Sequence, residues 1–480
     1  MNNRILFLLF IAFFFAACED KNNPIDEESD DDEGITEEPI ATATQEWIES
    51  IMRTHYYWYN EIPASENLDY TLDDESFFYS MLSKKDGKEY DGVMYHYSYI
   101  ENLFGTRTLP QTNNSYGFEF MLIANDNTYT SYRALVFYTT PGSPAETAGV
   151  KRGDWITRRN GESINANNYN LLYGAEACTF TVERWDDDKN DYVALPDPIS
   201  VSAAHAIEDN PVFLTKVIPW KGKKVGYLVY NHFTDGKSEG DVSYDNELRS
   251  MSAEFKEEGV NEFVLDLRYN NGGLLSSATI LCAILAPETA LGKELGHLKY
   301  NDKQSPQIRS FNMSESLLNP SGRNLNLETL YVLTSNSTAS ASEMIINSLK
   351  PFMEVVVIGE QTEGKNVGSL PYTSEDKNWE MHPIVCQIYN SDNFTDYANG
   401  FPPDYELNEA FEYVSSTTVT LVQLFPLGDE NERMLNAALR LIDDSYTVRS
   451  TRSASAKYEG PVFRSIDRKA TNGVVINVTE

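Results

Sequence analysis

Hydrophobic residues between 206 and 446 gather in short runs separated by longer amphipathic stretches, and this pattern predicts an α/β domain. Runs rich in Val, Leu and Tyr predict four strands, at 225–230, 262–267, 329–333 and 354–358. Apolar residues at helical spacing predict helices at 244–258, 275–285, 341–349 and 430–442. Alternation of strands and helices is typical of a sheet with helices packed on its faces.

Short apolar runs broken by turn residues extend over 112–205 and predict a separate β-rich domain. Runs at 115–120 and 134–138 predict strands. A helix that begins at Ser143 or Pro144 and ends at Gly149 follows ordinary capping chemistry. The Gly153-Asp154 pair then predicts a turn into another strand at 155–156.

Residues 44–111 combine helical spacing with many aromatic side chains. Trp47, Ile48, Ile51 and Met52 recur at intervals of three and four, and a second helix is expected at 75–82. We interpret this stretch as a small helical N-terminal domain whose aromatic residues form a core. The final stretch, 447–480, is polar at first with an apolar run at 474–478, and its pattern favours no particular element.

The first residues have the features of an export signal. Arg4 precedes an apolar run at 5–15, which is too short to span a bilayer and ends in Ala16-Ala17-Cys18. A cysteine after such a small pair resembles a bacterial lipoprotein processing site, with 1–17 as signal peptide and Cys18 as the lipidated residue. The alternative is an ordinary cleaved signal. We expect an exported chain, lipid-anchored to a bacterial membrane, most plausibly the outer one, and periplasmic or surface-facing.

Charge and cysteine content narrow the classes of partner. The formal net charge of -35 excludes nucleic acid and anionic membrane surfaces as favoured partners, because both repel an acidic protein. Part of this charge lies in 18–43, an acidic stretch with little to bury that should serve as a disordered tether. The remaining cysteines, Cys178, Cys282 and Cys386, lie in apolar contexts and suit core positions rather than a disulfide framework or a metal site.

Three predicted strands each run into an unusual loop, and candidate chemistry lies in these loops. The loops read DLRYNNGG at 266–273, TSNSTASASE at 334–343 and GEQTEGK at 359–365. Sites in open α/β sheets form outside the carboxyl ends of strands, so the three loops should meet. The helix after Ser340 leads away by about 14 Å. The next strand returns over about 17 Å, which brings Lys365 back to the level of Ser340.

Ser340 also has an ordinary structural reading. Ser340 and Glu343 are spaced as a capping box at a helix start, which needs no chemistry. The free amides and the positive dipole end at such a start would, however, also stabilise an oxyanion.

These three loops in this order resemble the C-terminal processing, or tail-specific, serine peptidases. The segment SPAETAGVKRGDWI at 143–156 resembles part of a bacterial PDZ domain, so the likeness covers roughly 112–445. The resemblance implies a multidomain α+β chain. It would comprise a helical domain at 44–111, a PDZ-like domain at 112–205, a crotonase/Clp-like βαβ serine peptidase domain at 206–446 and a tail at 447–480.

The resemblance also implies roles for particular residues. Ser340, rather than Ser337 or Ser342, would be the nucleophile and Lys365 the general base. The oxyanion hole would be formed by the amide of Ala341 and that of Gly272 or Gly273. Family members often carry a glutamine four residues after the lysine, where this chain has Ser369. Either Ser369 or Glu343 then supports the dyad, or the dyad works without a third member.

In PDZ domains a peptide adds as an extra strand and its terminal carboxylate binds backbone amides at a glycine loop. By position, Tyr116, Gly117, Phe118 and Phe120 would form that loop and its pocket. The implied partners are therefore protein or peptide substrates with accessible C-terminal tails.

Acyl transfer by this dyad places one demand on the structure. Lys365 must be uncharged to accept the Ser340 proton, so its pKa must fall by about three from about 10.4, at a cost of about 4 kcal/mol to the charged form. Burial in an apolar pocket supplies such a shift, so Lys365 must be buried. Asp266, Arg268 and Asn270 are expected to hold the glycine loop through hydrogen bonds. The chemistry requires neither a cofactor nor a metal.

Two other functions compete with peptidase activity. Gly359 to Lys365 nearly matches a phosphate-binding loop, but Asn366 replaces the Ser or Thr, and the following residues, 367–371, cannot open a helix. A catalytically silent, PDZ-based binding lipoprotein is the second alternative. His232 is expected to be structural, since none of the six histidines has a spacing that suggests a triad.

Overall fold

The computed structural model describes residues 41–90, 92–103, 114–125, 130–413, 419–446, 463–469 and 474–475. The described residues belong to one compact unit that begins at Ala41. The export signal, Cys18 and most of the acidic tether lie outside the described residues, so these expectations stay predictions.

A six-stranded sheet forms the centre of the α/β region, in the order β11-β12-β13-β16-β17-β22. All neighbouring strands are parallel except the β11–β12 hairpin. The four predicted strands are confirmed with small shifts at their ends. The strands are β11 (Val212–Trp220), β12 (Lys223–Tyr230), β13 (Glu262–Asp266), β16 (Thr329–Thr334), β17 (Glu354–Gly359) and β22 (Tyr405–Glu406).

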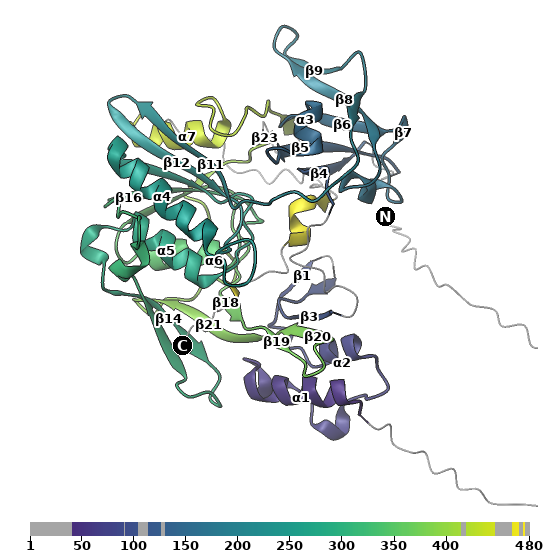
Figure 1. Ribbon diagram of the computed structural model, residues 1–480, viewed down its shortest axis with the longest axis vertical. Helices are drawn as coiled ribbons and strands as arrows, with labels where there is room; N and C mark the ends of the chain where they lie inside the picture. Colours follow the sequence, from purple (N-terminus) through teal and green to yellow (C-terminus); the bar gives the residue numbers. More distant parts are fainter. Residues whose placement is uncertain are drawn as a thin grey trace, which may run out of the picture. The chain divides into compact units, whose positions relative to one another are not determined.

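Helices cover both faces of this sheet (Figure 1). Leu248, Leu281 and Ile345 join one hydrophobic cluster on one face, whereas Leu435 and Ala438 join a second cluster on the other. All four predicted helices are confirmed, although the last begins three residues later than expected. They are α4 (Ser243–Glu258), α5 (Leu275–Leu285), α6 (Ala341–Leu349) and α7 (Arg433–Ile442).

The register of the parallel strands aligns their carboxyl ends. Asp266 of β13 pairs with Leu333 of β16, which pairs with Ile358 of β17. The loops that follow these three strands therefore leave the sheet at one level, as predicted from the strand–loop pattern.

The β-rich region forms an eight-stranded sheet in the order β10-β8-β6-β5-β4-β25, with β7 on β6 and β9 on β8. The predicted helix is α3 (Pro144–Ala148), capped by the Ser143 side chain and ended by Gly149 at a φ of 88°. The strands are β4 (Phe118–Ala124), β5 (Tyr132–Thr139), β6 (Trp155–Arg159), β7 (Glu162–Ser163), β8 (Cys178–Asp186), β9 (Asp191–Ala194), β10 (Ile199–Val201) and β25 (Phe463–Arg464).

The N-terminal region contains the predicted helices α1 (Ala43–His55) and α2 (Asp74–Ser80), but it is not wholly helical. It also forms β1 (Lys88–Tyr90), β2 (Val93–Tyr95) and β3 (Tyr99–Asn102). β3 pairs with β20 (Trp379–His382), and β20 also pairs with β19 (Tyr372–Thr373). The expectation of a purely helical region was wrong because helical spacing does not extend beyond α2 and the partner of β3 lies far along the chain.

A five-stranded sheet in the order β15-β14-β21-β18-β26 completes the core. Its strands are β14 (Glu294–Tyr300), β15 (Ile308–Asn312), β18 (Val367–Ser369), β21 (Ile384–Asn390) and β26 (Val474–Val475). β23 (Phe411–Tyr413) and β24 (Val419–Leu421) form a separate hairpin. β18 begins two residues after Lys365, so this sheet fixes the chain on the far side of the lysine.

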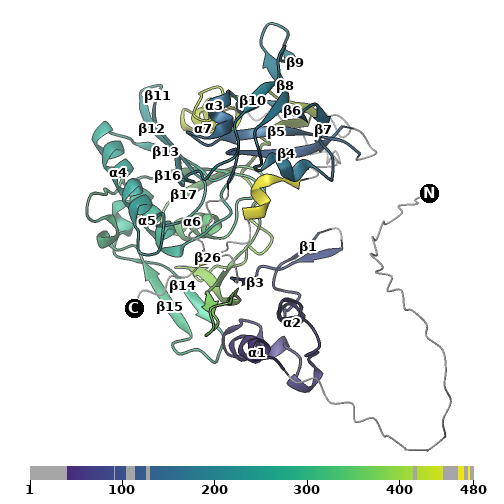
Figure 2. The same cartoon turned by 45° about the vertical axis from the view of Figure 1, so that its right-hand side comes forward.

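The C-terminal stretch, for which the sequence favoured no element, contributes strands to two sheets. β25 pairs with β4, and the 3-10 helix η6 (Ser465–Lys469) follows it directly; Figure 2 shows this yellow helix beside β4. β26 pairs with β18. Residues near the end of the chain thus touch both the β-rich region and the strand that follows Lys365.

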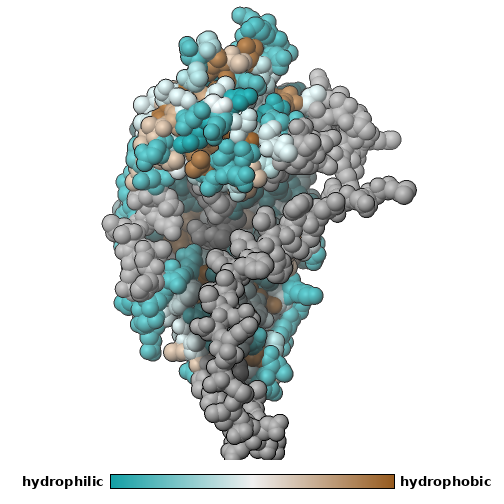
Figure 3. Space-filling model, turned by 90° about the vertical axis from the view of Figure 1, so that its right-hand side faces the viewer, coloured by the Kyte–Doolittle hydropathy of each residue, from teal (hydrophilic) through white to brown (hydrophobic). Residues whose placement is uncertain are grey.

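The surface agrees with an acidic protein whose apolar residues are mostly inside. Figure 3 shows one face on which hydrophilic residues predominate among those that are coloured. Cys178, Cys282 and Cys386 are buried free thiols, as expected. Of the helices in the described ranges, none has the length and apolar character that a membrane span requires.

Candidate active site

Ser340 lies at the point where the loop after β16 turns into α6, and its backbone is strained. Its φ of 62° and ψ of -112° fall in a region that residues with a side chain rarely adopt. The residue is fully buried. Strain of this kind persists only where surrounding contacts enforce it, and it concentrates at functional sites.

The Glu343 carboxylate ties the serine loop to the lysine loop. Its Oε2 accepts hydrogen bonds of 2.8 Å from the backbone N–H of Ser340 and from that of Lys365. Its Oε1 accepts bonds of 2.6 Å from the Gly364 N–H and from the Thr362 hydroxyl. The bond from Ser340 is one half of the predicted capping box, but the carboxylate also brings the backbones of the two candidate dyad residues together.

Lys365 meets the demand for a buried amine. Its side chain is 2% exposed, and burial lowers its pKa to about 8, although the charges of Asp86, Glu363 and Glu343 oppose this change. The ammonium position lies 4.9 Å from the centre of the Tyr97 ring. A large fraction of the protein therefore carries an uncharged amine here in mildly alkaline solution.

Glu343 is perturbed in the opposite sense. Burial raises its pKa to about 7, and the hydrogen bonds from Thr362, Ser340, Gly364 and Lys365 counter part of that rise. All four donors point at the carboxylate, an arrangement that suits its ionised, acceptor-only form.

The glycine loop packs directly against Ser340. A Cβ on Gly272, whose φ is 111°, would lie 2.8 Å from the Ser340 Cβ and 3.2 Å from the Ala341 nitrogen. Only a residue without a side chain fits this approach. Gly272 therefore lies beside the nucleophile candidate and beside one of the two expected oxyanion donors.

The N–H groups of Gly272 and Gly273, between which the sequence could not choose an oxyanion donor, differ in their hydrogen bonds. The Gly272 N–H donates to Asn270 Oδ1 at 2.8 Å, so it is already used within the loop. The bridge between Phe233 and Gly273 uses the Gly272 carbonyl and the Leu274 N–H, which leaves the Gly273 N–H outside it. Of the two, the Gly272 N–H is the one that is bonded within the loop, and the contribution of either amide to an oxyanion hole stays a prediction.

The residues that were expected to hold the glycine loop do so through buried polar contacts. Asn270 donates to the Tyr230 carbonyl at 2.8 Å. Arg268 is fully buried and pairs with Asp266 and Glu432, each at 2.8 Å. The Ser335 hydroxyl donates to the Arg268 carbonyl, which links the glycine loop to the serine loop. These contacts fix one loop relative to the other.

The same ion-pair cluster extends to the β-rich region. Arg152, which follows α3, pairs with Glu409 at 2.8 Å and donates to the Tyr269 hydroxyl at 2.6 Å. Tyr269 lies in the glycine loop and donates in turn to Glu409 at 2.6 Å. A buried side chain of the β-rich region is thus in direct contact with the candidate site's supporting loop.

The chain that follows Lys365 bears on the role of Ser369 and on the alternative of a phosphate-binding loop. Ser369 is buried in β18, four residues after Lys365. The chain after Lys365 forms this strand and not a helix, so the loop lacks the helix start that binds phosphate in nucleotide-binding proteins. Within the described ranges, no cluster of His, Cys, Asp and Glu is arranged to hold a metal ion.

In the loop that was expected to bind a peptide carboxylate, the N–H groups of Tyr116 and Gly117 already donate to acceptors within the chain. Tyr116 donates its N–H to the Tyr173 carbonyl at 2.9 Å, and Gly117 donates its N–H to the Ser115 hydroxyl at 2.9 Å. The side chains of Tyr116, Phe118 and Phe120 are buried in one hydrophobic cluster. The Tyr116 and Gly117 N–H groups are therefore bonded within the chain in this structure, and their binding of a peptide terminus stays a prediction.

Two residues near Lys365 were missed in the sequence. Tyr97 places its ring against the amine, and the buried Asp86 accepts bonds from the Tyr97 and Ser98 N–H groups at 3.1 and 3.0 Å. Both belong to the N-terminal region, far from the three loops in sequence. Their aromatic and acidic neighbours gave no local pattern that could have singled them out.

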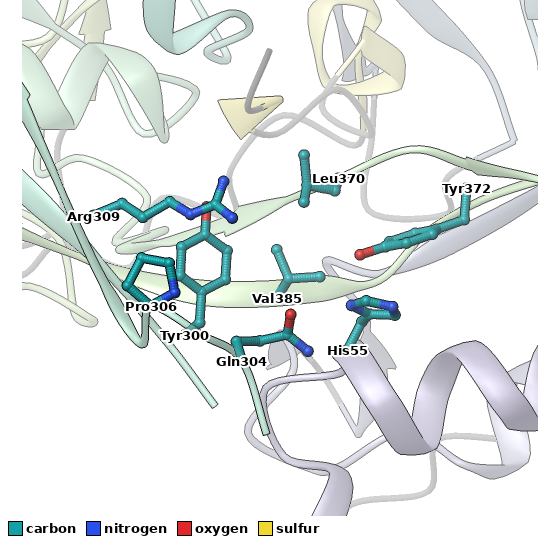
Figure 4. A pocket seen from close by; sticks show the side chains of 8 residues that line it. All are labelled: His55, Tyr300, Gln304, Pro306, Arg309, Leu370, Tyr372 and Val385. Carbon is teal, nitrogen blue, oxygen red and sulfur yellow. The ribbon is translucent and has the colours of Figure 1, made fainter. Parts of the chain in front are cut away.

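A cavity of about 160 Å³ lies away from these loops (Figure 4). His55 of α1 lies beside Tyr372 in the lining of this cavity, with ring centres 4.9 Å apart. None of the candidate dyad or oxyanion residues lines it. The lining residues are His55, Tyr300, Gln304, Pro306, Arg309, Leu370, Tyr372 and Val385.

Comparison with known proteins places this geometry in a family. Residues 224–407 match the model of peptidase family S41, and residues 43–99 match the peptidase S41 N-terminal domain. The crystal structure of a candidate S41 protease from Bacteroides fragilis is 37% identical, with a TM-score of 0.73 over 84% of this chain and 98% of that one.

Curated relatives are more distant. A candidate CtpA-like serine protease from Staphylococcus aureus strain N315 is 26% identical over 65% of this chain. One from Staphylococcus saprophyticus is 24% identical over 61%. The matched region spans 58% and 54% of these two relatives, respectively. The family models, together with the Bacteroides fragilis structure, show that the chain belongs to peptidase family S41.

Proposed function

We propose that the chain is a serine endopeptidase in which Ser340 is the nucleophile and Lys365 the general base. The observation that carries the proposal is the shared Glu343 carboxylate, which holds a strained serine and a buried, low-pKa lysine on adjoining loops. A lysine with this pKa is uncharged often enough near neutrality to accept a hydroxyl proton. The names of the relatives support the same reaction class.

The proposed reaction is acyl transfer through Ser340. Lys365 Nζ takes the Ser340 hydroxyl proton while Ser340 Oγ attacks the carbonyl carbon of the scissile peptide. The N–H groups of Ala341 and Gly273 stabilise the oxyanion that forms. Lys365 then gives its proton to the leaving amine. Water, deprotonated by Lys365, hydrolyses the acyl-enzyme and restores Ser340. Ser369 and Glu343 orient the lysine throughout.

The β-rich region serves as a PDZ-like module that presents substrate. A peptide would add as a strand along the outer edge of β4, whose other edge pairs with β5. The link from Arg152 to Tyr269 and Glu409 gives this module a direct contact with the loop beside Ser340. The substrates are exported proteins cut near their C-termini.

The same proposal includes export and anchoring. The apolar run at 5–15 and Cys18 support a lipoprotein held at a bacterial outer membrane, periplasmic or surface-facing. Metabolic labelling with a fatty-acid analogue tests this, because Cys18→Ser should abolish incorporation while Cys178→Ser should not.

A fluorophosphonate probe tests the catalytic proposal. The wild type should be labelled at Ser340 and should hydrolyse a casein substrate, whereas Ser340→Ala and Lys365→Ala should lose both properties. Ser348→Ala is a matched control, because Ser348 is a buried serine of the same helix that contributes nothing to the dyad. A wild type that binds peptides but neither reacts with the probe nor cleaves casein would instead be a silent peptide-binding lipoprotein.

A further inference from the structure

The C-terminal segment of the chain lies where a peptide would have to bind. β25 pairs antiparallel with β4, with Phe463 opposite Leu122 and Arg464 opposite Met121. The next residue continues the contact, because the Ser465 hydroxyl accepts a bond of 2.8 Å from the Phe120 N–H. An edge strand offers one row of backbone groups, so a peptide cannot pair with this part of β4 while β25 does.

Side chains fix the segment to this edge. The Phe463 ring lies 5.5 Å from that of Tyr169, 6.3 Å from that of Tyr173 and 6.5 Å from that of Phe120, measured between centres. The Ser465 hydroxyl also donates to the Glu119 carboxylate. The segment therefore packs against an aromatic cluster in addition to using the strand edge.

From Arg464 onward the segment touches all three loops that carry the candidate site. The Asn271 side chain, in the glycine loop, donates to the Ile466 carbonyl at 2.9 Å. The Ser337 hydroxyl, in the serine loop, donates to Asp467 at 2.8 Å. Arg464 bonds Asn336 and lies 3.6 Å from Glu360, at the start of the lysine loop.

The segment then reaches the strand beyond the lysine. Val474 and Val475 form β26, which pairs parallel with Gly368 and Ser369 of β18. The described parts of the segment thus mark a path from the β4 edge, past the loops of Ser340 and Lys365, to β18. A substrate that is bound by β4 and cut at Ser340 would have to pass the same loops.

We propose that residues 463–469 and 474–475 occupy the substrate path in cis, so that the chain holds itself inactive until a peptide displaces them. The inference rests on the proposed peptidase function and adds its regulation. β25 pairs over two residues, whereas β4 has seven, so a peptide that pairs along more of β4 can outcompete it. The segment also indicates the favoured ligand class: an extended peptide with an aromatic residue followed by a basic one.

A reversible clamp tests the proposal in the full chain. Met121 and Arg464 are directly opposite, so their Cα atoms lie about 4.5–5.5 Å apart, within the roughly 4.4–6.8 Å that a disulfide spans. In Met121→Cys/Arg464→Cys, oxidation should abolish casein cleavage and reduction should restore it. Met121→Cys alone, treated identically, controls for oxidation of other groups.

A release variant tests the opposite direction. Phe463→Ala removes the aromatic anchor and should raise kcat/KM for a peptide substrate by about tenfold if the segment occupies the path nine-tenths of the time. Phe394→Ala is the control, because it removes the same side chain from an exposed position outside the C-terminal segment. A fluorescent peptide of residues 460–469 should bind the release variant, as measured by anisotropy, and should not bind the oxidised clamp.

The outcomes separate this inference from the proposed function. If the oxidised clamp binds the peptide and cleaves casein as well as its reduced form does, the segment is not an occupant of the path. If fluorophosphonate never labels Ser340, the peptidase proposal fails. The anisotropy measurements on the release variant and the oxidised clamp still decide whether the segment blocks β4. Should Phe463→Ala fold poorly, the oxidised and reduced clamp gives the answer alone.

Discussion

The Glu343 carboxylate accepts a hydrogen bond of 2.8 Å from the Lys365 backbone N–H. The same oxygen accepts an equal bond from the backbone of Ser340, so a helix-capping side chain also aligns the two loops that carry the candidate dyad. The structural and the catalytic readings of the Ser-Ala-Ser-Glu segment are therefore compatible, because one carboxylate serves both purposes.

Activity should depend on pH through Lys365. Since its pKa is lowered to about 8, the uncharged fraction is roughly a tenth at pH 7 and rises through pH 8. We expect kcat/KM to increase about tenfold per pH unit below this value and to level off above it. Glu343, with a pKa of about 7, is mostly ionised from pH 8 upward, so its own titration affects the profile only at the acidic end. A rate profile from pH 5 to 9.5 checks this, and a flat profile contradicts an uncharged lysine base.

Lys365→Met should stabilise the fold while it abolishes activity. The pKa of Lys365 is lower in the folded chain than in the unfolded chain, so the unfolded chain binds more protons between about pH 8 and 10.5. The lysine therefore destabilises the fold fully below pH 8, by at most about 3 kcal/mol, and less as pH rises toward 10.5.

We expect the free energy of unfolding of Lys365→Met to exceed that of the wild type by about 1–3 kcal/mol at pH 7 and by less at pH 10. Urea denaturation at both pH values provides the measurement. Lys256→Met, at an exposed position of α4, should change little at either pH. If Lys365→Met were less stable than the wild type at pH 7, the contacts of the amine would stabilise the fold by more than its burial destabilises it.

Glu343→Gln should impair both stability and turnover. A glutamine offers one oxygen and an NH₂ group to four donors, so some buried N–H groups lose their acceptor, at about 1–3 kcal/mol each. Misalignment of the loops should lower kcat by about 100-fold with a smaller effect on KM. Thermal melts and steady-state kinetics measure both effects. Glu354→Gln, exposed at the start of β17, is the control and should leave kcat and the melting temperature unchanged.

Gly272→Ala should disable Ser340 without unfolding the chain. The added methyl group would meet the Ser340 Cβ at 2.8 Å, and the backbone φ of 111° adds strain of about 1–2 kcal/mol. We expect fluorophosphonate labelling to fall at least about tenfold. Gly292→Ala carries similar strain at a φ of 83°, but its Cβ would meet nothing within 4 Å. Equal labelling of the two variants would argue that Gly272 is needed only for its backbone conformation.

The sequence was informative where structure depends on neighbours along the chain. The strands at 225–230 and 354–358 and the helix after Ser143 were predicted because apolar spacing and capping residues are local signals. The proximity of the Ser340 loop and the Lys365 loop was predicted because the carboxyl ends of parallel strands lie at the same edge of the sheet. The Gly272-Gly273 pair was recognised, but only the structure shows that the Gly272 N–H is already bonded.

The sequence was silent where distant segments pair. The pairing of β3 with β20, of β25 with β4 and of β26 with β18 joins residues more than 100 positions apart. No periodicity within either partner encodes the other, so the N-terminal strands and the C-terminal segment went unassigned. Tyr97 was missed for the same reason, since its approach to Lys365 follows from the placement of the N-terminal region.

The pairing of β25 with β4 is intramolecular, and this has a consequence for the concentration at which outside peptides act. A segment joined to its site by a short chain experiences an effective concentration in the millimolar range, to within an order of magnitude. A free peptide with equal intrinsic affinity would have to approach that concentration to compete. Free peptide fragments at lower concentrations would therefore not displace β25 from β4. A partner that also binds a second surface of the protein would displace it at a far lower concentration.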